Sequence, residues 1–302
     1  MKVLVLGGTG FIGFPAAQAL VRKGYTVYSL ARSEAKEKTL AAEETTAKHD
    51  QHGVDHTGDV SSDAWIPLIA TLDVIIETVT GSADGSRSVL ERVEKAATAL
   101  RPPGSPLLSY IYTSGTWVHG DSRTTTVTDT TPILTPAKLV AWRPAIEQLI
   151  VSSTVLNGIV IRPALLYGRS ASIFSMLFKG AAEGRVSWPG TPGGRYALVH
   201  ADDLAELYVL CAEKASVVGG KIVDGANPMT ESVDELLEKL VRVSGARGPY
   251  EYREPADPFE EAITTNTLLR PYLANALLGW TPKKQGFVDG LEMYYVAWQA
   301  SL

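Results

Sequence analysis

Short apolar runs, many rich in β-branched residues, alternate with amphipathic stretches through the first half of the chain. The short runs predict strands, and the amphipathic stretches predict helices. This alternation is typical of a parallel sheet with helices on both faces. The predicted strands are Lys2–Leu6, Tyr25–Leu30, Gly53–His56, Val74–Val79, Leu107–Thr113 and Gly158–Arg162. The predicted helices are Phe11–Lys23, Glu34–Lys48, Ser61–Thr71, Ser86–Leu100 and a segment between Ala137 and Ser153.

After Arg162 the regular pattern breaks into shorter pieces, separated by clusters of glycine and proline that indicate turns. We therefore expect an α/β protein with a Rossmann-type doubly wound parallel sheet and a smaller C-terminal substrate lobe. Residues 1–168 are predicted to form the dinucleotide-binding domain. Residues 169–302 are predicted to form mainly the substrate lobe, with residues 196–228 returning to the first domain.

Length and charge narrow the class of protein. The 302 residues are enough for one large α/β unit with a lobe. The net charge of -5 and the lack of a basic cluster argue against a nucleic-acid partner. A single cysteine, Cys211, cannot form an internal disulfide, and no Cys/His spacing suggests zinc, so we expect no metal and a reducing compartment. No apolar run is long enough for a signal peptide or a membrane span, which predicts a cytoplasmic protein with no membrane partner.

A glycine-rich loop follows the first predicted strand directly and opens the first predicted helix. In the sequence GGTGFIG, Gly7 permits a tight turn, Gly10 lets a pyrophosphate approach the backbone, and Gly13 lets the helix pack closely on the strand. Because the loop stands between a strand and a helix, the pattern predicts a dinucleotide site rather than a simple turn. The loop residues expected to bind the cofactor are Gly7, Thr9, Gly10, Phe11, Ile12 and Gly13.

The end of the second predicted strand indicates which dinucleotide is bound. Enzymes that use NAD carry an acidic residue there, which holds the ribose hydroxyls. This chain instead has Arg32 and Ser33, with Lys36 one turn further on. A guanidinium at this position suits the 2′-phosphate of NADP, so we predict NADP as the cofactor. The alternative is that Arg32 is an ordinary solvated surface residue.

Six motifs in order along the chain resemble those of the extended or atypical branch of the short-chain dehydrogenase/reductase superfamily, which includes the NAD-dependent epimerases and dehydratases. The glycine loop matches GxxGxxG, residues 56–60 (HTGDV) resemble the adenine-side motif, and residues 112–120 (YTSGTWVHG) resemble YSSxxVYG. The later matches are residues 161–168 to RPxxVYG, residues 198–205 to FVHVDDLA, and residues 278–282 with 290–291 to the LGWxP and GL pair. The resemblance implies that Asp59, Val60 and Pro163 also contact the cofactor.

The resemblance also implies a Ser/Tyr/Lys triad, and here all three of its positions are altered. The register places Gly115 at the serine position, Leu139 at the tyrosine position and Arg143 at the lysine position. Leucine cannot transfer a proton, so any acid–base chemistry needs another group. Arg143 is a permanent cation, which suits it to hold the cofactor ribose or a substrate oxygen, although a surface helix cation is the alternative. Pro144 after it predicts a helix that is kinked or begins here.

Several hydroxyl and imidazole groups near the expected nicotinamide are candidates to replace the missing triad. Ser114 and Thr116 flank Gly115 at the carboxyl end of the fifth predicted strand, where open α/β sheets bind ligands, and we favour Thr116. His119 stands where the family usually has tyrosine, and Tyr167 follows the sixth predicted strand. For both, capping or core packing is the alternative. An apolar lid over the pocket, or an ordinary lobe core, is suggested by Phe174, Met176, Phe178 and Trp188.

Three functions are compatible with this sequence. The first is an NADP-dependent reductase or dehydrogenase of a small, largely apolar carbonyl, imine or enone compound. The second is a non-redox epimerase, dehydratase, isomerase or cyclase, suggested by the loss of tyrosine and lysine. The third is a catalytically silent NADP-binding regulator similar to NmrA-like proteins. Fold analogy does not separate them. The sequence leaves the oligomeric state open, a homo-oligomer included.

Overall fold

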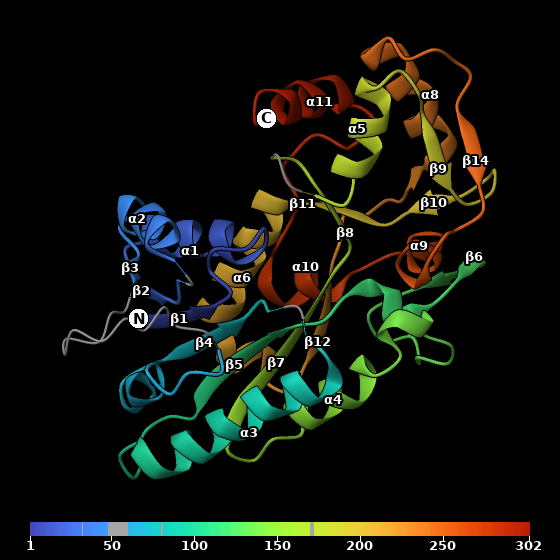
Figure 1. Ribbon diagram of the computed structural model, residues 1–302. Coiled ribbons are helices and arrows are strands. Elements are labelled where there is room, and N and C mark those ends of the chain that lie inside the picture. Colours follow the sequence, from blue (N-terminus) through green and yellow to red (C-terminus); the bar gives the residue numbers. More distant parts are fainter. Residues whose placement is uncertain (32, 48–59, 80, 170–171) are drawn as a thin grey trace. The chain divides into compact units, whose positions relative to one another are not determined.

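The structure is a computed structural model that describes residues 1–31, 33–47, 60–79, 81–169 and 172–302 (Figure 1). The chain divides into two compact units, each assembled from three segments. Unit 1 contains Met1–Ser114, Ala145–Ile161 and Ala205–Ile222. Unit 2 contains Gly115–Pro144, Arg162–Leu204 and Val223–Leu302.

The centre of the fold is a seven-stranded sheet with the strand order β12-β7-β5-β4-β1-β2-β3. The strands from β7 to β3 in that order run parallel to their neighbours. Their bounds are β1 Lys2–Leu6, β2 Thr26–Ser29, β3 Thr46–Ala47, β4 Val74–Glu77, β5 Leu108–Thr113, β7 Leu156–Pro163 and β12 Ile222–Gly225. The strand order changes direction at β1, between β4 and β2, which makes its carboxyl end the usual ligand site of such a sheet. The predicted Rossmann-type fold is confirmed.

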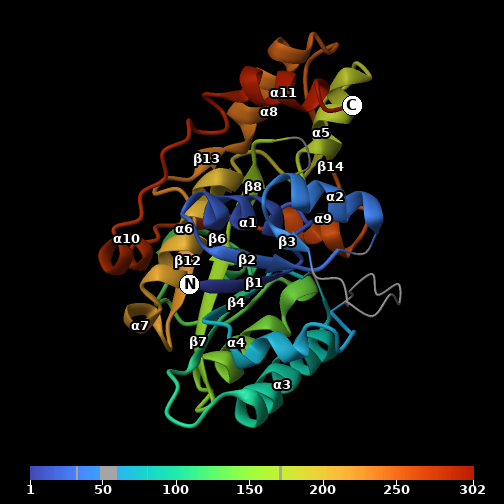
Figure 2. The ribbon, with the colours of Figure 1, turned by 90° about the vertical axis from the view of Figure 1, so that its left-hand side faces the viewer.

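Helices cover both faces of this sheet (Figures 1 and 2). α1, α2 and α6 lie on one face, and α3 and α4 lie on the other. The helices and the 3-10 turn η1 have the bounds α1 Gly13–Arg22, α2 Glu34–Ala42, η1 Ile66–Ala70, α3 Ala83–Leu100, α4 Arg143–Val151, α6 Ala201–Glu213 and α7 Ala215–Val218. α4 begins at Arg143, one residue before the proline that predicted a helix start there. The sheet core consists of fully buried aliphatic side chains, those of β1 above all.

Three predicted elements need correction or lie outside the described residues. The helix predicted to reach Lys48 ends at Ala42, because Glu44 takes a left-handed conformation (φ 56°) and residues 46–47 pair with β2 as β3. The helix predicted over 61–71 is only the short 3-10 turn η1. The strand predicted at Gly53–His56 lies outside the described residues.

Unit 2 consists of short elements with small paired strands. β8 pairs with β11, β9 with β14 and β6 with β15 in parallel, and β10 pairs with β13 antiparallel. The strands are β6 Ser122–Val127, β8 Leu165–Tyr167, β9 Ser187–Pro189, β10 Arg195–Tyr196, β11 Leu198–His200, β13 Glu231–Ser232, β14 Glu251–Arg253 and β15 Thr267–Leu269. The helical elements are η2 Thr116–His119, η3 Lys138–Val140, α5 Ser175–Ala182, α8 Val233–Ser244, α9 Pro258–Ile263, α10 Leu273–Leu278 and α11 Leu291–Gln299.

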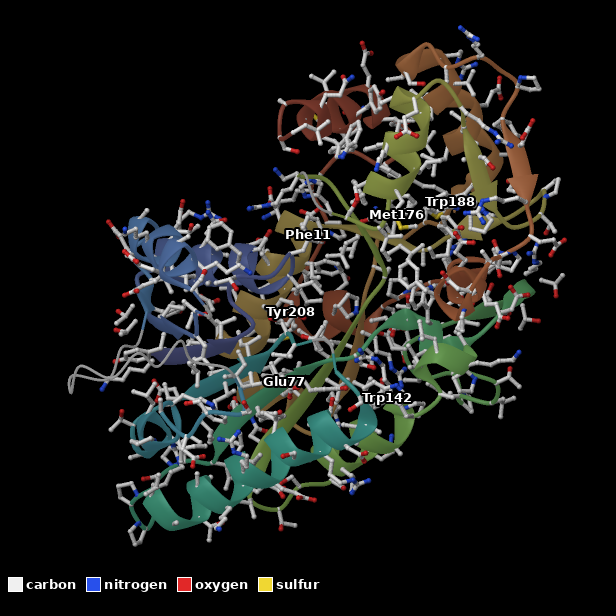
Figure 3. All side chains as sticks on the ribbon, viewed as in Figure 1. Phe11, Glu77, Trp142, Met176, Trp188 and Tyr208 are labelled. Carbon is white, nitrogen blue, oxygen red and sulfur yellow. The ribbon has the colours of Figure 1, made fainter. Side chains whose placement is uncertain are left out.

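The interior of unit 2 is an aromatic cluster. Phe174 stacks on Trp188 with ring centroids 6.0 Å apart and contacts Phe287 at 4.5 Å, and Phe178 packs on Tyr295 and Trp298. Phe174, Phe178 and Trp188 are buried, whereas Met176, near the start of α5, is 45% exposed (labelled in Figure 3). The apolar residues read from the sequence as a possible lid are therefore core residues, with Met176 as the exception.

Candidate functional site

The glycine loop forms the turn between β1 and α1. Gly7 has a φ of +87°, and the Gly10 amide donates to the Gly7 carbonyl at 2.8 Å, which closes the turn. A Cβ at Gly13 would lie 2.3 Å from the Gly7 oxygen and 2.5 Å from Thr78 Oγ1, so only glycine lets the helix approach the loop this closely. Gly7 and Gly13 therefore have the structural roles that the sequence predicted.

The approach to Gly10 is open. Gly10 is exposed, and the nearest described atom to a Cβ there is the Gly7 oxygen at 3.1 Å. α1 begins directly behind it with Ile12 at its N-cap position, and isoleucine has no polar group to cap the first-turn amides. The Phe14 amide donates to the Gly10 carbonyl at 3.0 Å and Pro15 has no amide hydrogen, so the feature that suits an anion is the positive end of the helix, which no side chain caps. The loop thus fits the pyrophosphate of a dinucleotide, with Thr9, Phe11 and Ile12 half-buried around it (Phe11 is labelled in Figure 3).

The end of β2 carries the predicted specificity residues, of which Arg32 lies outside the described residues. Ser33 is exposed and serves as the N-cap of α2, where its Oγ accepts from the Lys36 amide at 3.4 Å. Ser33 and Lys36 therefore lie at the positive end of a helix. Glu34 and Glu37 lie in the same first turn, so the positive helix end and Lys36 are partly offset there by two carboxylates.

Of the two predicted adenine-side residues, Asp59 and Val60, the structure describes only Val60. Asp59 lies outside the described residues, and Val60 is the first residue described after it. The Val60 carbonyl accepts hydrogen bonds from a guanidinium nitrogen of Arg92 on α3 and from Trp65 Nε1 at 3.3 Å. The backbone at Val60 is thus fixed by two side chains.

Ser114 ends the run of buried residues along β5. Its amide donates to the Ile161 carbonyl at 2.8 Å, but its buried Oγ has no hydrogen-bond partner among the described residues. A buried hydroxyl without a partner is uncommon and calls for an explanation such as a missing ligand. The hydroxyl of the preceding residue, Thr113, is in contrast paired with the Tyr208 hydroxyl at 2.6 Å. Ser114 Oγ is therefore a buried donor without an acceptor among the described residues, just after the carboxyl end of β5.

Gly115 and Thr116 follow in unit 2. Gly115 has extended backbone (φ 177°), and the nearest described atom to a Cβ there is the Pro163 oxygen at 3.8 Å. A side chain would fit, so steric crowding does not require glycine at this position. Thr116 is buried as the first residue of η2. Pro163, another predicted cofactor contact, is buried at the end of β7.

His119, at the end of η2, has a buried acidic partner. Its Nε2 lies 2.9 and 3.1 Å from the two carboxylate oxygens of Asp224 on β12, and both side chains are almost fully buried. Arg162 lies 3.9 Å from the same carboxylate, and the Asp224 amide donates to Asp129 Oδ1 at 2.7 Å. Burial raises the pKa of Asp224, and the contact with His119 opposes that rise. This contact ties η2 to β12 and occupies Nε2, so any proton transfer by His119 would have to use Nδ1.

Tyr167 ends β8 and is completely buried. Its hydroxyl donates to the Gln285 carbonyl at 3.0 Å and accepts from Asn227 Nδ2 at 3.2 Å. Its ring contacts His200, Phe287 and Tyr294 at centroid distances of 5.2 Å. Burial raises its pKa well above the usual value. These contacts describe a core tyrosine whose proton is already committed to a hydrogen bond.

The two remaining triad positions differ in exposure. Leu139, in η3, is 39% exposed, and Arg143 is buried at the start of α4. The Arg143 guanidinium lies over the ring of Trp142, 4.7 Å from its centroid. Neither side chain is suited to act as a general acid or base, because leucine has no ionisable group and a guanidinium is a permanent cation.

Three residues of these arrangements were absent from the sequence-based candidates: Asp224, Asn227 and Arg92. Asp224 had a signal, because a carboxylate within the apolar run IVDG needs a partner when the strand is buried. The sequence contains no comparable signal for Asn227 or Arg92, since asparagine and arginine are ordinary surface residues. Among the described residues, no group of three or more His, Cys, Asp or Glu side chains could hold a metal ion. None of the described helices is long and apolar enough to span a bilayer.

Comparison with known proteins gives a consistent result. The family model described as "NAD dependent epimerase/dehydratase family" matches residues 3–224. A curated relative, the decarboxylating sterol-4-alpha-carboxylate 3-dehydrogenase of Dictyostelium discoideum, is 24% identical over 225 residues, which cover 70% of this chain and 68% of the relative.

Solved structures share the fold at low sequence identity. UDP-glucuronic acid 4-epimerase from Bacillus cereus in complex with NAD has a TM-score of 0.76 at 18% identity, with 99% of each chain covered. dTDP-glucose 4,6-dehydratase from Bacillus anthracis with NAD has a TM-score of 0.77 at 16% identity, covering 100% of this chain and 97% of the other. A human epimerase family protein with NADPH has a TM-score of 0.72 at 17% identity, covering 98% and 99%.

Proposed function

Since the chain belongs to the NAD-dependent epimerase/dehydratase family of the short-chain dehydrogenase/reductase superfamily, whose members bind a nicotinamide dinucleotide, we propose that it is an NADP-dependent reductase or dehydrogenase. Its substrate in this proposal is a small, largely apolar carbonyl, imine or enone compound. The active site is a non-standard one, because the positions of the family triad hold Gly115, Leu139 and Arg143.

The observation that carries the proposal is the intact cofactor loop. The closed turn at Gly7, the open face of Gly10 and the uncapped start of α1 are the features that a pyrophosphate requires. A bound nicotinamide cofactor supplies the hydride donor or acceptor. The residues of the chain bind it, orient the substrate oxygen or nitrogen, and handle the proton.

The unpartnered Ser114 hydroxyl is the best-supported group for orienting the substrate. It lies at the carboxyl end of β5, and a substrate carbonyl oxygen would give it the acceptor that it lacks among the described residues. Thr116 is the second candidate. We propose Arg143 as an electrostatic residue, since its charge is independent of pH in the working range. With the Tyr167 hydroxyl engaged in a buried hydrogen bond, the proton comes from another hydroxyl, from His119 through Nδ1, from the solvent or from the substrate itself.

The choice of NADP over NAD rests on the residues at the end of β2. Ser33 and Lys36 lie at the start of α2, and the sequence places Arg32 beside them in place of the acid that NAD enzymes use. A charge-assisted hydrogen bond to the 2′-phosphate contributes about 1.5–3 kcal/mol, which is a preference of more than tenfold in affinity.

Calorimetry with NADP⁺ and NAD⁺ on the wild type and Arg32→Ala tests this preference. We expect the wild type to favour NADP⁺ by more than tenfold and Arg32→Ala to remove most of that difference, with NAD⁺ affinity nearly unchanged. Lys23→Ala, a surface cation just after α1, is the control and should leave both affinities as they are. Equal wild-type affinities for the two dinucleotides would refute the NADP assignment.

A non-redox reaction on the same fold is the second candidate, favoured by the leucine and glycine at the tyrosine and serine positions. The assay that separates the two follows NADPH oxidation with a panel of carbonyl, imine and enone compounds. Turnover of any member supports the reductase. Stoichiometric cofactor binding without turnover of the panel favours an epimerase, dehydratase, isomerase or cyclase, or a silent regulator.

A further inference from the structure

Arg92, in the middle of α3, binds one short segment of chain through several contacts. Its guanidinium donates to the Val60 carbonyl, to the Ser62 carbonyl at 2.6 Å and to the Asp63 carboxylate at 2.7 Å. The Asp63 side chain is 91% exposed, so that ion pair alone contributes little. The two carbonyl contacts are the ones that fix the backbone of residues 60–62.

The same guanidinium lies over an aromatic ring from that segment. Arg92 is 5.2 Å from the ring centroid of Trp65, which is fully buried. Trp65 Nε1 donates to the same Val60 carbonyl at 3.3 Å. Arginine presents a planar fork of donors and can stack at the same time, which lysine cannot do. The Val60 carbonyl is thus held by two donors, the Arg92 guanidinium and the Trp65 indole.

The topology of the sheet places the two ends of the connection that contains this segment. In a doubly wound sheet the pyrophosphate lies at the loop after β1, and the adenosine ribose lies at the end of β2. β3 pairs parallel to β2 and ends at the same carboxyl edge, whereas β4 begins at the opposite edge. The connection from β3 to β4 therefore starts on the adenosine side, and Val60 is the first described residue of its later part.

A second arginine, at the C-cap of α3, also donates to backbone carbonyls, at the amino edge of the sheet. Arg101, just after the helix ends, donates to the carbonyls of Ile69, Leu72 and Pro106 at 3.1, 2.6 and 2.9 Å. Leu72 precedes β4, and Pro106 precedes β5, so these contacts lie at the amino edge of the sheet, far along the strands from the cofactor loop. Both arginines therefore donate to backbone carbonyls of the β3–β4 connection, Arg92 at Val60 and Ser62 and Arg101 at Ile69 and Leu72, which makes Arg101 a suitable control.

We propose that Arg92 is a positioning residue for the adenosine half of the cofactor, which it serves by fixing the backbone at Val60 through the paired carbonyl contacts and the stack on Trp65. The inference rests on the proposed cofactor site and is independent of the choice between NAD and NADP. A segment held in its binding conformation before the ligand arrives binds more tightly, because less ordering is needed on binding.

The test compares Arg92→Ala with Arg101→Ala in the full-length protein by calorimetry with AMP, nicotinamide mononucleotide, NAD⁺ and NADP⁺. We expect Arg92→Ala to weaken AMP and both dinucleotides by about tenfold, the cost of ordering one short loop segment, and to leave nicotinamide mononucleotide unchanged. Arg101→Ala should lower the midpoint of thermal unfolding by about as much as Arg92→Ala does, but it should leave all four affinities unchanged. Arg92→Lys should restore only part of the AMP affinity.

The outcomes separate this inference from the proposed function. If the wild type binds neither dinucleotide, the cofactor site itself is refuted. If the wild type binds them and Arg92→Ala loses no more AMP affinity than Arg101→Ala does, Arg92 is only a structural residue and the inference is wrong. An equal loss of AMP and nicotinamide mononucleotide affinity would also overturn it, because that result would reflect a general loosening of unit 1.

Discussion

At Gly115, which the sequence predicts to occupy the serine position of the family triad, the backbone would accept a side chain. The residue is extended, and a Cβ there meets ordinary contact distances only. We predict that Gly115→Ser folds normally, with the free energy of unfolding within about 0.5 kcal/mol of the wild type and an unchanged cofactor affinity. Thermal unfolding and calorimetry measure both quantities.

Gly13→Ala is the contrasting variant for that experiment. Its Cβ would lie 2.3 Å from a backbone oxygen, so the loop or the helix must shift, at a cost of about 1–3 kcal/mol. A marked loss of stability in Gly115→Ser, or none in Gly13→Ala, would mean that the steric reading of these two positions is wrong.

The sequence led to a prediction for the triad positions because these are counted at fixed spacings from local motifs, and that prediction is not tested by the structure. The sequence did not reveal the pairing of His119 with Asp224, which are 105 residues apart, because no local pattern records a contact made by the folding of distant strands. For the same reason Tyr167 looked available from its motif. Its hydroxyl partner, the Gln285 carbonyl, comes from a segment 118 residues away.

Among the secondary-structure elements, α2 shows why a boundary was missed. The helix ends in a Schellman motif, in which the Thr45 amide donates to the Leu40 carbonyl and the Glu44 amide to the Ala41 carbonyl. Such a motif usually carries glycine at the left-handed position, and glycine would have marked the end of the helix in the sequence. Here that position is Glu44, at φ 56°, so the usual stop signal is missing.

We therefore predict that Glu44→Gly stabilises the protein. The left-handed conformation costs a residue with a Cβ about 1–2 kcal/mol, and the greater freedom of glycine in the unfolded chain takes back about 0.5–1 kcal/mol. A net gain of about 0.5–1 kcal/mol should appear as a higher denaturant midpoint. The neighbouring Glu43→Gly, at φ -99°, relieves no strain and should not stabilise. A gain in Glu43→Gly alone would contradict the explanation.

The strands of the main sheet were predictable, and most of those in unit 2 were not. β1, β4, β5 and β7 are runs of four or more buried residues, which give a clear signal in the sequence. Strands such as β10 and β13 have two residues each and contain no period to detect. Their pairing depends on the tertiary packing around them.

At the scale of the whole molecule, unit 1 is completed by residues far along the chain. Ala205–Ile222 belong to it, and their side chains at Leu207, Tyr208 and Cys211 are fully buried. We predict that a fragment of residues 1–168 does not fold by itself, because it exposes the sheet face that these residues cover. Far- and near-ultraviolet circular dichroism against the full chain tests this, with residues 1–228 as the matched longer fragment. A cooperative thermal transition in the fragment 1–168 would contradict the prediction.

The chain crosses between its two units five times, at 114/115, 144/145, 161/162, 204/205 and 222/223. A module joined by one linker can be replaced in a single genetic recombination, but a unit joined by five crossings cannot, since each foreign segment would have to meet a resident strand or helix in register. New selectivity in unit 2 is therefore accessible through substitutions and loop insertions within its segments. A chain with this connectivity is therefore expected to change its selectivity gradually, by substitutions in unit 2, while the sheet of unit 1 is kept.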